Sequence, residues 1–344
     1  MSHLGRPKGS PDPAFSLAPV ARRLASLSSA PVRFVADTVG EEARAAVESL
    51  AEGEILLLEN TRFLPGETDD DPALGEAMAA LGDLYVNDAF GSAHRAHAST
   101  AGVARTVKAS GGLAVAGLLM EKELAFLGDA LDEPERPFVA ILGGAKISGK
   151  IDVVEALLPR VDRLLIGGAM ANTFLLALGL PVGKSLVEED RVSMARELMD
   201  RAGDRLVLPV DCRVAHGIAA DAATRVAPRD GVGAGEVIGD IGPETEGLYR
   251  DVVRQARTIL WNGPMGVFEM EPFAHGTLAL ARAVAEATEA GATSVLGGGD
   301  SAAAAEAAGV SDRLTHVSTG GGASLEFLAG AELPGVAVLS DQEA

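Results

Sequence analysis

The chain has 344 residues, of which 47% are hydrophobic and only 4% aromatic, so it can fill the cores of two domains chiefly with aliphatic side chains. Its 29 basic and 49 acidic residues give a net charge of −20, which repels nucleic acid and anionic membranes and argues against both as partners. The single cysteine, Cys212, excludes an internal disulfide, and with no signal-peptide-like or membrane-spanning run in the sequence we expect a cytoplasmic protein.

Strand-like aliphatic runs alternate with amphipathic runs along most of the chain. In the first third, residues 32–37, 54–60 and 83–90 are strand-like, and residues 41–53 and 71–82 between them are helix-like. Nearly pure aliphatic strands are typical of parallel sheets that are buried on both faces. The alternation therefore predicts an α/β fold with right-handed crossovers.

A long amphipathic helix is predicted over residues 117–137, because its leucines recur at helical spacing. A second α/β series follows it, with strand-like runs at residues 137–151, 163–174, 205–211, 258–268, 293–305 and 315–327. We therefore predict two similar Rossmann-like lobes, 1–120 and 137–330, each a parallel sheet flanked by helices, with an interdomain helix at 121–136. The tail, 331–344, is too short to form a domain and should pack on one of the lobes.

Glycine-rich turns follow several strands of the second series and lead into helices. They lie at residues 143–144, 167–168, 297–299 and 320–322. Glycine lets the backbone approach a ligand, and the start of the next helix offers N–H groups and a positive dipole end to phosphate. One such turn says little, because tight turns need glycine anyway. Four turns at one edge of a parallel sheet indicate a nucleotide cleft.

Residues 143–151 nearly form a P-loop, but Ile151 stands where a serine or threonine should bind magnesium. Residues 179–185 have one residue too few between their glycines, so the P-loop NTPase class is rejected. Lys146 and Lys150 lie one helical turn apart and can neutralise a phosphate chain. Taken alone, two solvated surface lysines would be an equally good interpretation.

Asp300 and Ser301 begin an alanine-rich helix after three glycines. An aspartate at a helix start caps free N–H groups, and for this stretch alone that interpretation is favoured. The functional alternative has Asp300 hold Mg²⁺ on nucleotide phosphates while backbone N–H groups bind those phosphates.

Polar side chains gather in the first lobe where strand-like runs end and near the start of the chain. They are Glu59, Asn60 and Arg62 after one run, Asn87, Asp88, His94, Arg95 and His97 after another, and His3, Arg6 and Lys8. Metal binding by the histidines is not favoured, because no third ligand of suitable spacing follows. Open α/β sheets bind ligands at the carboxyl ends of their strands, so a small substrate with phosphate and carboxylate groups is expected here.

At this point a family resemblance becomes visible over essentially the whole chain. The motifs SHLGRPKG, LLLENTRF, VNDAFGSAHRAHAST, LLMEKEL, RPFVAILGGAK, VGKSL, WNGPMGVFE, GGGDSAA and STGGGASLEFL resemble, in this order, the phosphoglycerate kinase family. The resemblance implies a monomeric hinge enzyme of glycolysis that moves a phosphoryl group between 1,3-bisphosphoglycerate and ADP, giving 3-phosphoglycerate and ATP, with Mg²⁺ carried on the nucleotide. It also implies that the first lobe binds phosphoglycerate, the second binds nucleotide, the helix acts as hinge and the tail returns to the first lobe.

The resemblance further implies roles for individual residues. The substrate-binding residues would be His3, Leu4, Gly5, Arg6, Arg62 and Arg95, and the catalytic residues Lys146, Lys150, Gly299 and Gly322. The nucleotide-binding residues would be Lys150, Gly239, Glu269, Gly298, Gly299, Asp300 and Ser301, with Asp300 also the metal ligand. The segment around Gly239, residues 237–243, is shorter than the family pattern.

In the family that the chain resembles, a strand ending in an Asp-x-Asn motif and a catalytic arginine precede SHLGRP. The sequence shows neither, so we expect an amino-terminally shortened protein whose first lobe lacks a central strand. Two functions stay open on these grounds: a working kinase, or an impaired protein that only binds Mg-nucleotide.

Overall fold

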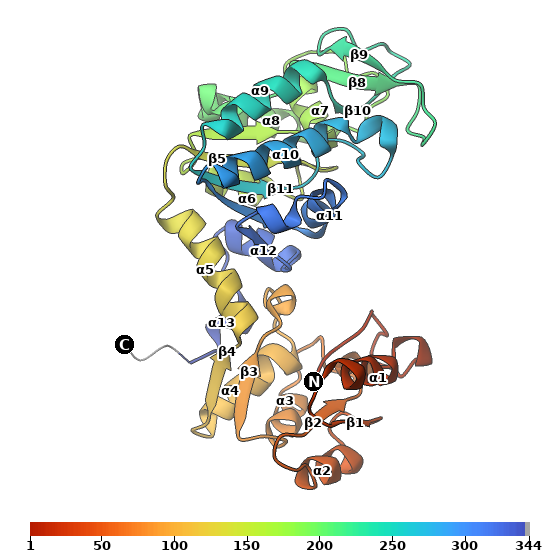
Figure 1. Ribbon diagram of the computed structural model, residues 1–344, viewed down its shortest axis with the longest axis vertical. Helices are drawn as coiled ribbons and strands as arrows, with labels where there is room; N and C mark the ends of the chain where they lie inside the picture. Colours follow the sequence, from red (N-terminus) through yellow and green to blue (C-terminus); the bar gives the residue numbers. More distant parts are fainter. Residues whose placement is uncertain (341–344) are drawn as a thin grey trace. The chain divides into compact units, whose positions relative to one another are not determined.

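The computed structural model of the chain describes residues 1–340 and divides into two compact units (Figure 1). Unit 1 contains Met1–Glu121 and the chain from Glu332 onward, and unit 2 contains Lys122–Ala331. Part of the predicted tail, residues 341–344, lies outside the described residues. Within the described residues, no helix is both long and apolar enough to cross a membrane.

Unit 1 combines short parallel strands with short helices. Its strands are β1 (Val32–Val35), β2 (Ile55–Leu58), β3 (Leu84–Asn87) and β4 (Leu113–Ala116). Its helices are η1 (Pro13–Phe15), α1 (Ala18–Leu27), α2 (Glu41–Glu48), η2 (Thr61–Phe63), α3 (Pro72–Ala79), η3 (Phe90–Ser92), the π-helix η4 (Ala98–Gly102), α4 (Val103–Ala109) and α13 (Pro334–Ala337), and α5 (Leu118–Asp132) leads into unit 2. Local residues determine where helix α3 begins, since Asp71 accepts a hydrogen bond from the Ala73 N–H and Pro72 stands at the first helical position.

The strands of unit 1 form two separate parallel pairs, β1–β2 and β3–β4. In each pair, one edge of every strand is therefore without a neighbouring strand among the described residues. A cavity of about 240 Å³ borders both pairs, with Leu56 and Leu58 of β2 and Leu84 and Tyr85 of β3 in its lining. The α/β class is confirmed, but this lobe has a divided sheet instead of a continuous one.

The end of the described chain packs on unit 1. Asn87 Nδ2 donates to Gly335 O at 3.1 Å, and Gly335 N donates to Ala93 O at 2.8 Å. Lys108 Nζ donates to Leu339 O at 2.9 Å, and the Leu339 side chain belongs to the buried apolar cluster of α3, β3 and α4. These contacts place residues from opposite ends of the sequence in one core.

Unit 2 is built on a six-stranded parallel sheet with the order β13-β12-β11-β5-β6-β7. Its strands are β5 (Phe138–Leu142), β6 (Arg163–Ile166), β7 (Leu206–Val207), β11 (Thr258–Asn262), β12 (Thr293–Gly297) and β13 (His316–Val317). The helices are α6 (Ile151–Leu157), α7 (Gly168–Ala177), η5 (Glu189–Arg191), α8 (Val192–Ala202), η6 (Gly203–Arg205), α9 (Pro243–Arg254), η7 (Glu271–Phe273), α10 (His275–Glu289), α11 (Gly299–Ala307), η8 (Ser311–Arg313) and α12 (Gly322–Leu328). Figure 1 shows α9 and α10 side by side, which agrees with their close packing.

The central strands of this sheet are buried on both faces, as the aliphatic runs predict. All five residues of β5 and all five of β11 are buried. Val139, Ile141, Ile259 and Trp261 point into one cluster with Tyr249 and other side chains of α9 and α10. Each such large side chain contributes about 1.5–3 kcal/mol of burial free energy.

A second, antiparallel sheet in unit 2 is not predicted by the sequence pattern. It has the order β10-β8-β9, formed by Val237–Ile241, Asp211–Ala215 and Arg225–Pro228. The pairing of β10 with β8 shifts between Ile238 and Asp240. This irregularity explains why strict period-2 alternation does not mark β10 in the sequence.

Candidate functional site

Three loops meet at the carboxyl ends of β5, β6 and β11 in unit 2. Gly143 N donates to Asn262 O at 3.0 Å, and Gly144 N donates to Pro264 O at 3.0 Å. Gly168, with φ of +66°, lies so close that an added Cβ would be 2.4 Å from Gly144 N. The glycines of these turns are therefore needed for loop packing itself, in addition to any approach of a ligand.

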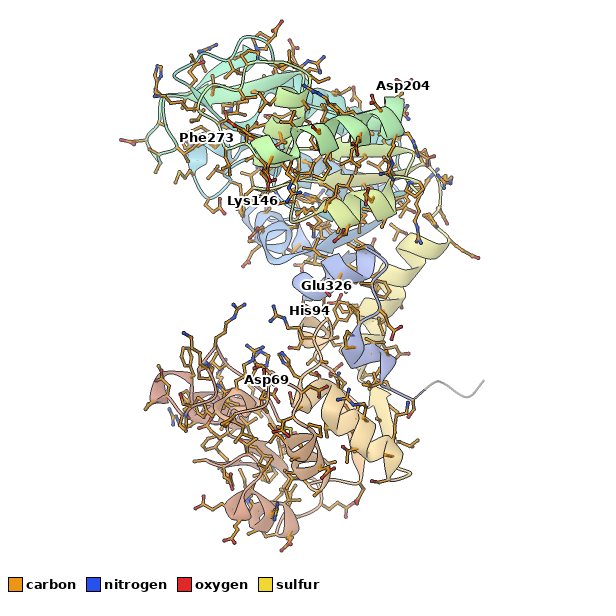
Figure 2. All side chains as sticks on the ribbon, turned by 180° about the vertical axis from the view of Figure 1, so that it is seen from behind. Asp69, His94, Lys146, Asp204, Phe273 and Glu326 are labelled. Atoms are coloured by element: carbon orange, nitrogen blue, oxygen red, sulfur yellow. The ribbon has the colours of Figure 1, made fainter. Side chains whose placement is uncertain are left out.

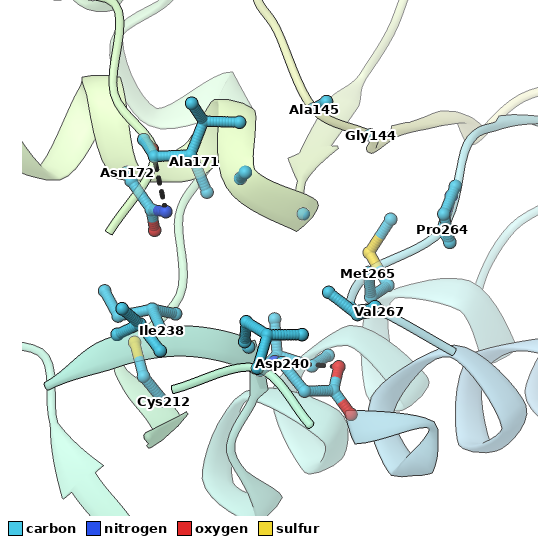
Figure 3. A pocket seen from close by; sticks show the side chains of 18 of the residues that line it. Gly144, Ala145, Ala171, Asn172, Cys212, Ile238, Asp240, Pro264, Met265 and Val267 are labelled. Carbon is cyan, nitrogen blue, oxygen red and sulfur yellow. Dashed lines mark hydrogen bonds between the residues drawn. The ribbon is translucent and has the colours of Figure 1, made fainter. Parts of the chain in front are cut away.

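A pocket of about 480 Å³ opens beside these loops (Figure 3). Figure 3 shows Ala171 and Asn172 on one side of it and Pro264 and Met265 on another. Its other lining residues include Gly144, Gly168, Leu175, Lys184, Ile238, Gly239, Asp240, Val267, Glu269 and Asp300. Apolar walls with a few polar groups and this volume suit a nucleotide-sized ligand.

Lys150 lies just before α6 and is bound by oxygens of two neighbouring strands. Its Nζ donates to Gly143 O at 2.6 Å, to Asn262 O at 2.9 Å and to Asn262 Oδ1. Burial lowers the pKa of Lys150 to about 8, and the charge of Asp300 opposes this shift. The ammonium group is thus held at the sheet edge by neutral oxygens that an anionic ligand can replace.

The neighbouring lysine, Lys146, is exposed in the same loop (Figure 2). Glu188 holds this loop, since its carboxylate accepts hydrogen bonds from Ser148 N, at 3.1 Å, and from Ser148 Oγ. Burial would raise the pKa of Glu188, but these hydrogen bonds and the charge of Lys146 together lower it. Neither Glu188 nor Asn262 was singled out from the sequence, because no local motif marks their long-range partners.

The third glycine turn places Asp300 in the first turn of α11, at the rim of the pocket. Gly298 has φ of +89°, a conformation that favours glycine, and Asn262 Nδ2 donates to Gly297 O at 2.8 Å. Ser301 is fully buried, and its hydroxyl accepts a hydrogen bond from Gly263 N at 2.6 Å. In the structure, Ser301 thus joins α11 to the β11 loop and does not line the pocket.

Two other predicted glycines occupy different environments. Gly239 lines the pocket, and a Cβ there would be 2.2 Å from the ring of Phe273. Gly322 begins α12, which packs against α6, the helix that follows Lys150.

Asp240, which no motif in the sequence marks, also lines this pocket. Its carboxylate accepts hydrogen bonds from Ile241 N at 2.9 Å and from Gly276 N at 2.7 Å, which links β10 to the start of α10. Burial raises the pKa of Asp240 to about 8, against the lowering effect of these two donors. A Cβ at Gly266 or Gly276 would lie within 2.5 Å of its Oδ1, so small residues make room for it.

The donor chemistry of unit 2 fits magnesium carried by a nucleotide. Mg²⁺ is commonly bound by one or two carboxylates together with substrate phosphates and water. Asp300 offers one carboxylate at the pocket rim, and the described residues contain no group of three or more histidine, cysteine, aspartate or glutamate side chains placed to hold a metal.

In unit 1, two polar side chains that follow β2 bind the first residues of the chain. Asn60 Nδ2 donates to Leu4 O at 2.8 Å and to Phe15 O at 2.9 Å. Glu59, which is buried, accepts hydrogen bonds from Leu17 N at 2.8 Å and Ser16 Oγ at 2.7 Å. The Glu59–Asn60 pair therefore anchors the first residues of the chain to the carboxyl end of β2.

Cationic groups gather beside this anchor, where the charges of Arg6 and Arg95 act on Arg62. His3 and His97 help to line a neighbouring hollow of about 510 Å³. Arg62 Nη1 donates to Gly5 O at 2.9 Å, while its buried Nε finds no hydrogen-bond partner among residues 1–340. Burial lowers the pKa of Arg62, and the nearby charges of Arg6 and Arg95 lower it further. The predicted substrate residues thus converge on one cationic site.

The same repulsion acts on the two histidines of the hollow. Burial lowers the pKa of His3 and His97, and the charge of Arg62 lowers both further. Asn87 and Asp88, in contrast, serve structural contacts: Asn87 binds Gly335, and Asp88 accepts hydrogen bonds from the first N–H groups of α5.

A lysine held at a glycine-lined pocket of an α/β unit, together with a cationic site in a second unit, is the arrangement expected of a phosphotransferase that uses a nucleotide. The chain matches the model of the family described as phosphoglycerate kinase over residues 1–331, and it belongs to this family.

Curated relatives support this assignment over nearly the whole chain. The phosphoglycerate kinase of Chlorobaculum tepidum is 56% identical over 344 residues, which cover 99% of this chain and 86% of the relative. That of Chloroflexus aurantiacus is 57% identical over 348 residues, with 100% and 86% covered.

Solved structures show the same fold. The phosphoglycerate kinase from Coxiella burnetii has a TM-score of 0.86 at 44% identity, covering 98% of this chain and 84% of that one. The Pyrococcus horikoshii enzyme has a TM-score of 0.83 at 36% identity, with the same shares covered. The resemblance drawn from the motifs is confirmed, and the chain is a phosphoglycerate kinase by family. Because the matches span both units, the alternative of a protein that only binds nucleotide is not favoured.

Proposed function

We propose that the chain catalyses reversible phosphoryl transfer between 1,3-bisphosphoglycerate and ADP, giving 3-phosphoglycerate and ATP, as a cytoplasmic monomer in glycolysis. The observation that carries the mechanism is Lys150, whose ammonium group is bound by Gly143 and Asn262 beside the glycine turn that leads to Asp300. Phosphoryl transfer needs little covalent chemistry from the protein. It needs alignment of donor and acceptor and compensation of negative charge.

The nucleotide belongs in the pocket of unit 2. The apolar side chains of Leu175, Ile238 and Val267 can cover the base, and Gly239 lines the same wall. Glu269 lines the same pocket and is proposed to bind the ribose hydroxyls. The N–H groups of Gly298 and Gly299 at the start of α11 are proposed to bind the phosphate chain, and Ser301 holds this turn through its hydrogen bond with Gly263 N.

Charge compensation is assigned to the cations and the bound metal. Mg²⁺, held by Asp300 and the nucleotide, would supply positive charge to the phosphate oxygens. Lys150 exchanges its carbonyl partners for oxygens of the transferring group. Lys146, an exposed lysine of the same loop, adds a second ammonium group. The N–H groups at Gly299 and Gly322 are proposed to assist from two helix starts.

The phosphoglycerate belongs in the cationic site of unit 1. Arg62 and Arg95 are proposed to bind its phosphate and carboxylate, with His3 and Arg6 from the opening loop. The backbone of Leu4 and Gly5 shapes that loop through Asn60 and Arg62. Helix α5 is proposed as the hinge through which the two ligands are brought to react.

The test is ATP-dependent phosphorylation of 3-phosphoglycerate by the purified chain, measured over a range of Mg²⁺ concentrations. We expect turnover that requires Mg²⁺, and a loss of the Mg²⁺-dependent part of nucleotide affinity in Asp300→Ala. Glu306→Ala, which removes an exposed carboxylate of the same helix, is the matched control and should behave like the wild type. Turnover that ignores 3-phosphoglycerate would contradict the proposal, and an unchanged Mg²⁺ dependence in Asp300→Ala would remove Asp300 from its role.

A further inference from the structure

A buried carboxylate lies within the cationic site of unit 1. Glu67 is only 2% exposed, yet it borders the hollow that His3 and His97 also line. A negative charge in such a site would repel an anionic ligand. Glu67 therefore requires a physical explanation of its own.

The hydrogen bonds of Glu67 connect two segments that carry the cations. Its carboxylate accepts from Ser99 Oγ at 2.5 Å and from Ser99 N at 3.0 Å, both in η4. It also accepts from Thr61 Oγ1 at 3.2 Å, in the turn η2 that carries Arg62. One carboxylate thus holds the Arg62 turn against the segment that follows His97.

The backbone around Glu67 strengthens this connection. Ala98 N donates to Glu67 O at 2.9 Å, directly after His97. Tyr85 of β3 holds η4 from another side, because its hydroxyl donates to Ser99 O at 2.9 Å. Within the described residues, these contacts leave η4 attached both to η2 and to β3, so His97 and Arg62 have a fixed separation.

Glu67 also acts on the charges of the site. The groups that face His97 are Arg62, Arg95, His94 and Glu67, and Glu67 is the one that raises the pKa of His97. At His3, the charges of Arg62 and His97 lower the pKa while Glu67 raises it.

At Arg62, the charges of Arg6 and Arg95 lower the pKa, and the charge of Glu67 raises it. Cations held at close range without a ligand repel one another, and a buried anion offsets this repulsion. Because hydroxyl and N–H donors already surround the carboxylate, its charge is spread over them and is less exposed to the ligand.

We infer that Glu67 is a positioning residue of the anion site: it fixes the Arg62 turn against η4 and offsets the positive charge that gathers there before a ligand binds. The inference rests on the proposed function only in naming phosphoglycerate as that ligand. It does not make Glu67 a catalytic residue, since nothing requires it to touch the reacting atoms.

The central experiment is Glu67→Gln, which keeps the size of the side chain and removes its charge. Glu76→Gln, an exposed carboxylate on α3 in the same unit, is the matched control. In the ligand-free protein, histidine C2-proton NMR should show lower pKa values for His3 and His97 in Glu67→Gln and no change in the control. Unchanged titration of both histidines would overturn the electrostatic part of the inference.

The binding experiment uses isothermal titration calorimetry with 3-phosphoglycerate and, separately, with Mg-ADP. We expect Glu67→Gln to bind 3-phosphoglycerate at least about tenfold more weakly, because a charged hydrogen-bond network is lost. Mg-ADP affinity should be unchanged, which also shows that unit 2 is intact. Equal or tighter binding of 3-phosphoglycerate would overturn the inference, since Glu67 would then merely oppose the ligand.

A second variant, Ser99→Ala, separates position from charge and remains informative if Glu67→Gln does not fold. It removes one donor to the carboxylate but keeps the charge, so weaker 3-phosphoglycerate binding with unchanged histidine pKa values is expected. Normal binding in Ser99→Ala would contradict the positioning role. If the wild-type chain itself does not bind 3-phosphoglycerate, the proposed function fails, while the histidine titration still decides the role of Glu67.

Discussion

The two units carry the same α/β pattern in sequence but complete it to different degrees. In unit 2 the central strands β5 and β11 have neighbours on both sides, and Leu260 and Trp261 are fully buried. In the described part of unit 1, β3 pairs with β4 alone, and its side chains Leu84 and Val86 are 55% and 49% exposed. Full burial of one such side chain contributes about 1.5–3 kcal/mol to stability. The partly exposed Leu84 and Val86 therefore contribute less burial free energy than the side chains of β5 and β11.

The comparison also separates the kinds of site that the units support. The pocket of unit 2 lies at the edge of a complete sheet, where the strand ends hold glycine turns and Lys150 in place. The cationic site of unit 1 depends on side-chain contacts such as Asn60 with Leu4 and Glu67 with Ser99. An incomplete sheet can therefore still organise a site when buried polar side chains connect its loops.

The largest effect is expected from Lys150→Ala, which removes the cation at the edge of the complete sheet. Turnover should fall by about 10³-fold or more, because charge compensation in the transition state is lost. Nucleotide affinity should change far less. Arg257→Ala, which removes an exposed cation just before β11, is the control, and steady-state kinetics with direct nucleotide titration are the measurement. A loss of nucleotide affinity with unchanged kcat would place Lys150 in ground-state binding only.

The corresponding test of unit 1 is Arg62→Ala. We expect the Michaelis constant for 3-phosphoglycerate to rise by about 10²-fold, because a charged contact to a buried anion is removed. The constant for ATP should stay near its wild-type value. Arg33→Ala supplies the control, since the Arg33 Nη1 atom of β1 lies 3.7 Å from the partly exposed carboxylate of Glu54. A selective effect on ATP would reverse the assignment of the two sites.

Hydrogen exchange tests the difference in stability itself. Amides of β2 and β3 are expected to exchange at least about tenfold faster than those of β5 and β11, because unit 1 opens at lower free energy. Exchange monitored by mass spectrometry of peptides from each strand gives the comparison within one sample. Equal protection in both units would show that the divided sheet of unit 1 costs it no stability.

The smallest effect concerns pH and the buried ammonium of Lys150. Since burial lowers the pKa of Lys150 to about 8, the rate kcat/KM for nucleotide should decline as pH rises through that value and the lysine loses its charge. Lys150→Arg should move this alkaline limb to higher pH.

The free energy of unfolding should change with pH in the opposite sense to kcat/KM, because the same Lys150 ammonium group titrates. Between pH 8 and the ordinary pKa of lysine, the unfolded chain binds more protons than the folded one, so this group makes folding more favourable as pH rises. If the alkaline decline of kcat/KM is unchanged in Lys150→Arg, the titrating group is a residue other than Lys150.

Much of the site can be predicted from short-range patterns. The near P-loop around Lys150, the glycines before Asp300 and the cations around Arg62 are visible in the sequence, and the structure brings each group to a strand end. Less predictable are the partners: Asn262 is 112 residues from Lys150, and Glu67 is 32 residues from Ser99. No local spacing relates such pairs, because their contact depends on how the strands are ordered in the sheet.

The sequence by itself determined the α/β class, the family and the residue types at each site, since these follow from periodicity, turn chemistry and local motifs. Only the tertiary structure decided that the strands of unit 1 stand as two pairs, that β8, β9 and β10 form a separate antiparallel sheet, and that Glu67 lies buried among cations. Strand order and burial arise from long-range packing. This packing determines which groups surround a side chain, and those neighbours determine its charge and its role.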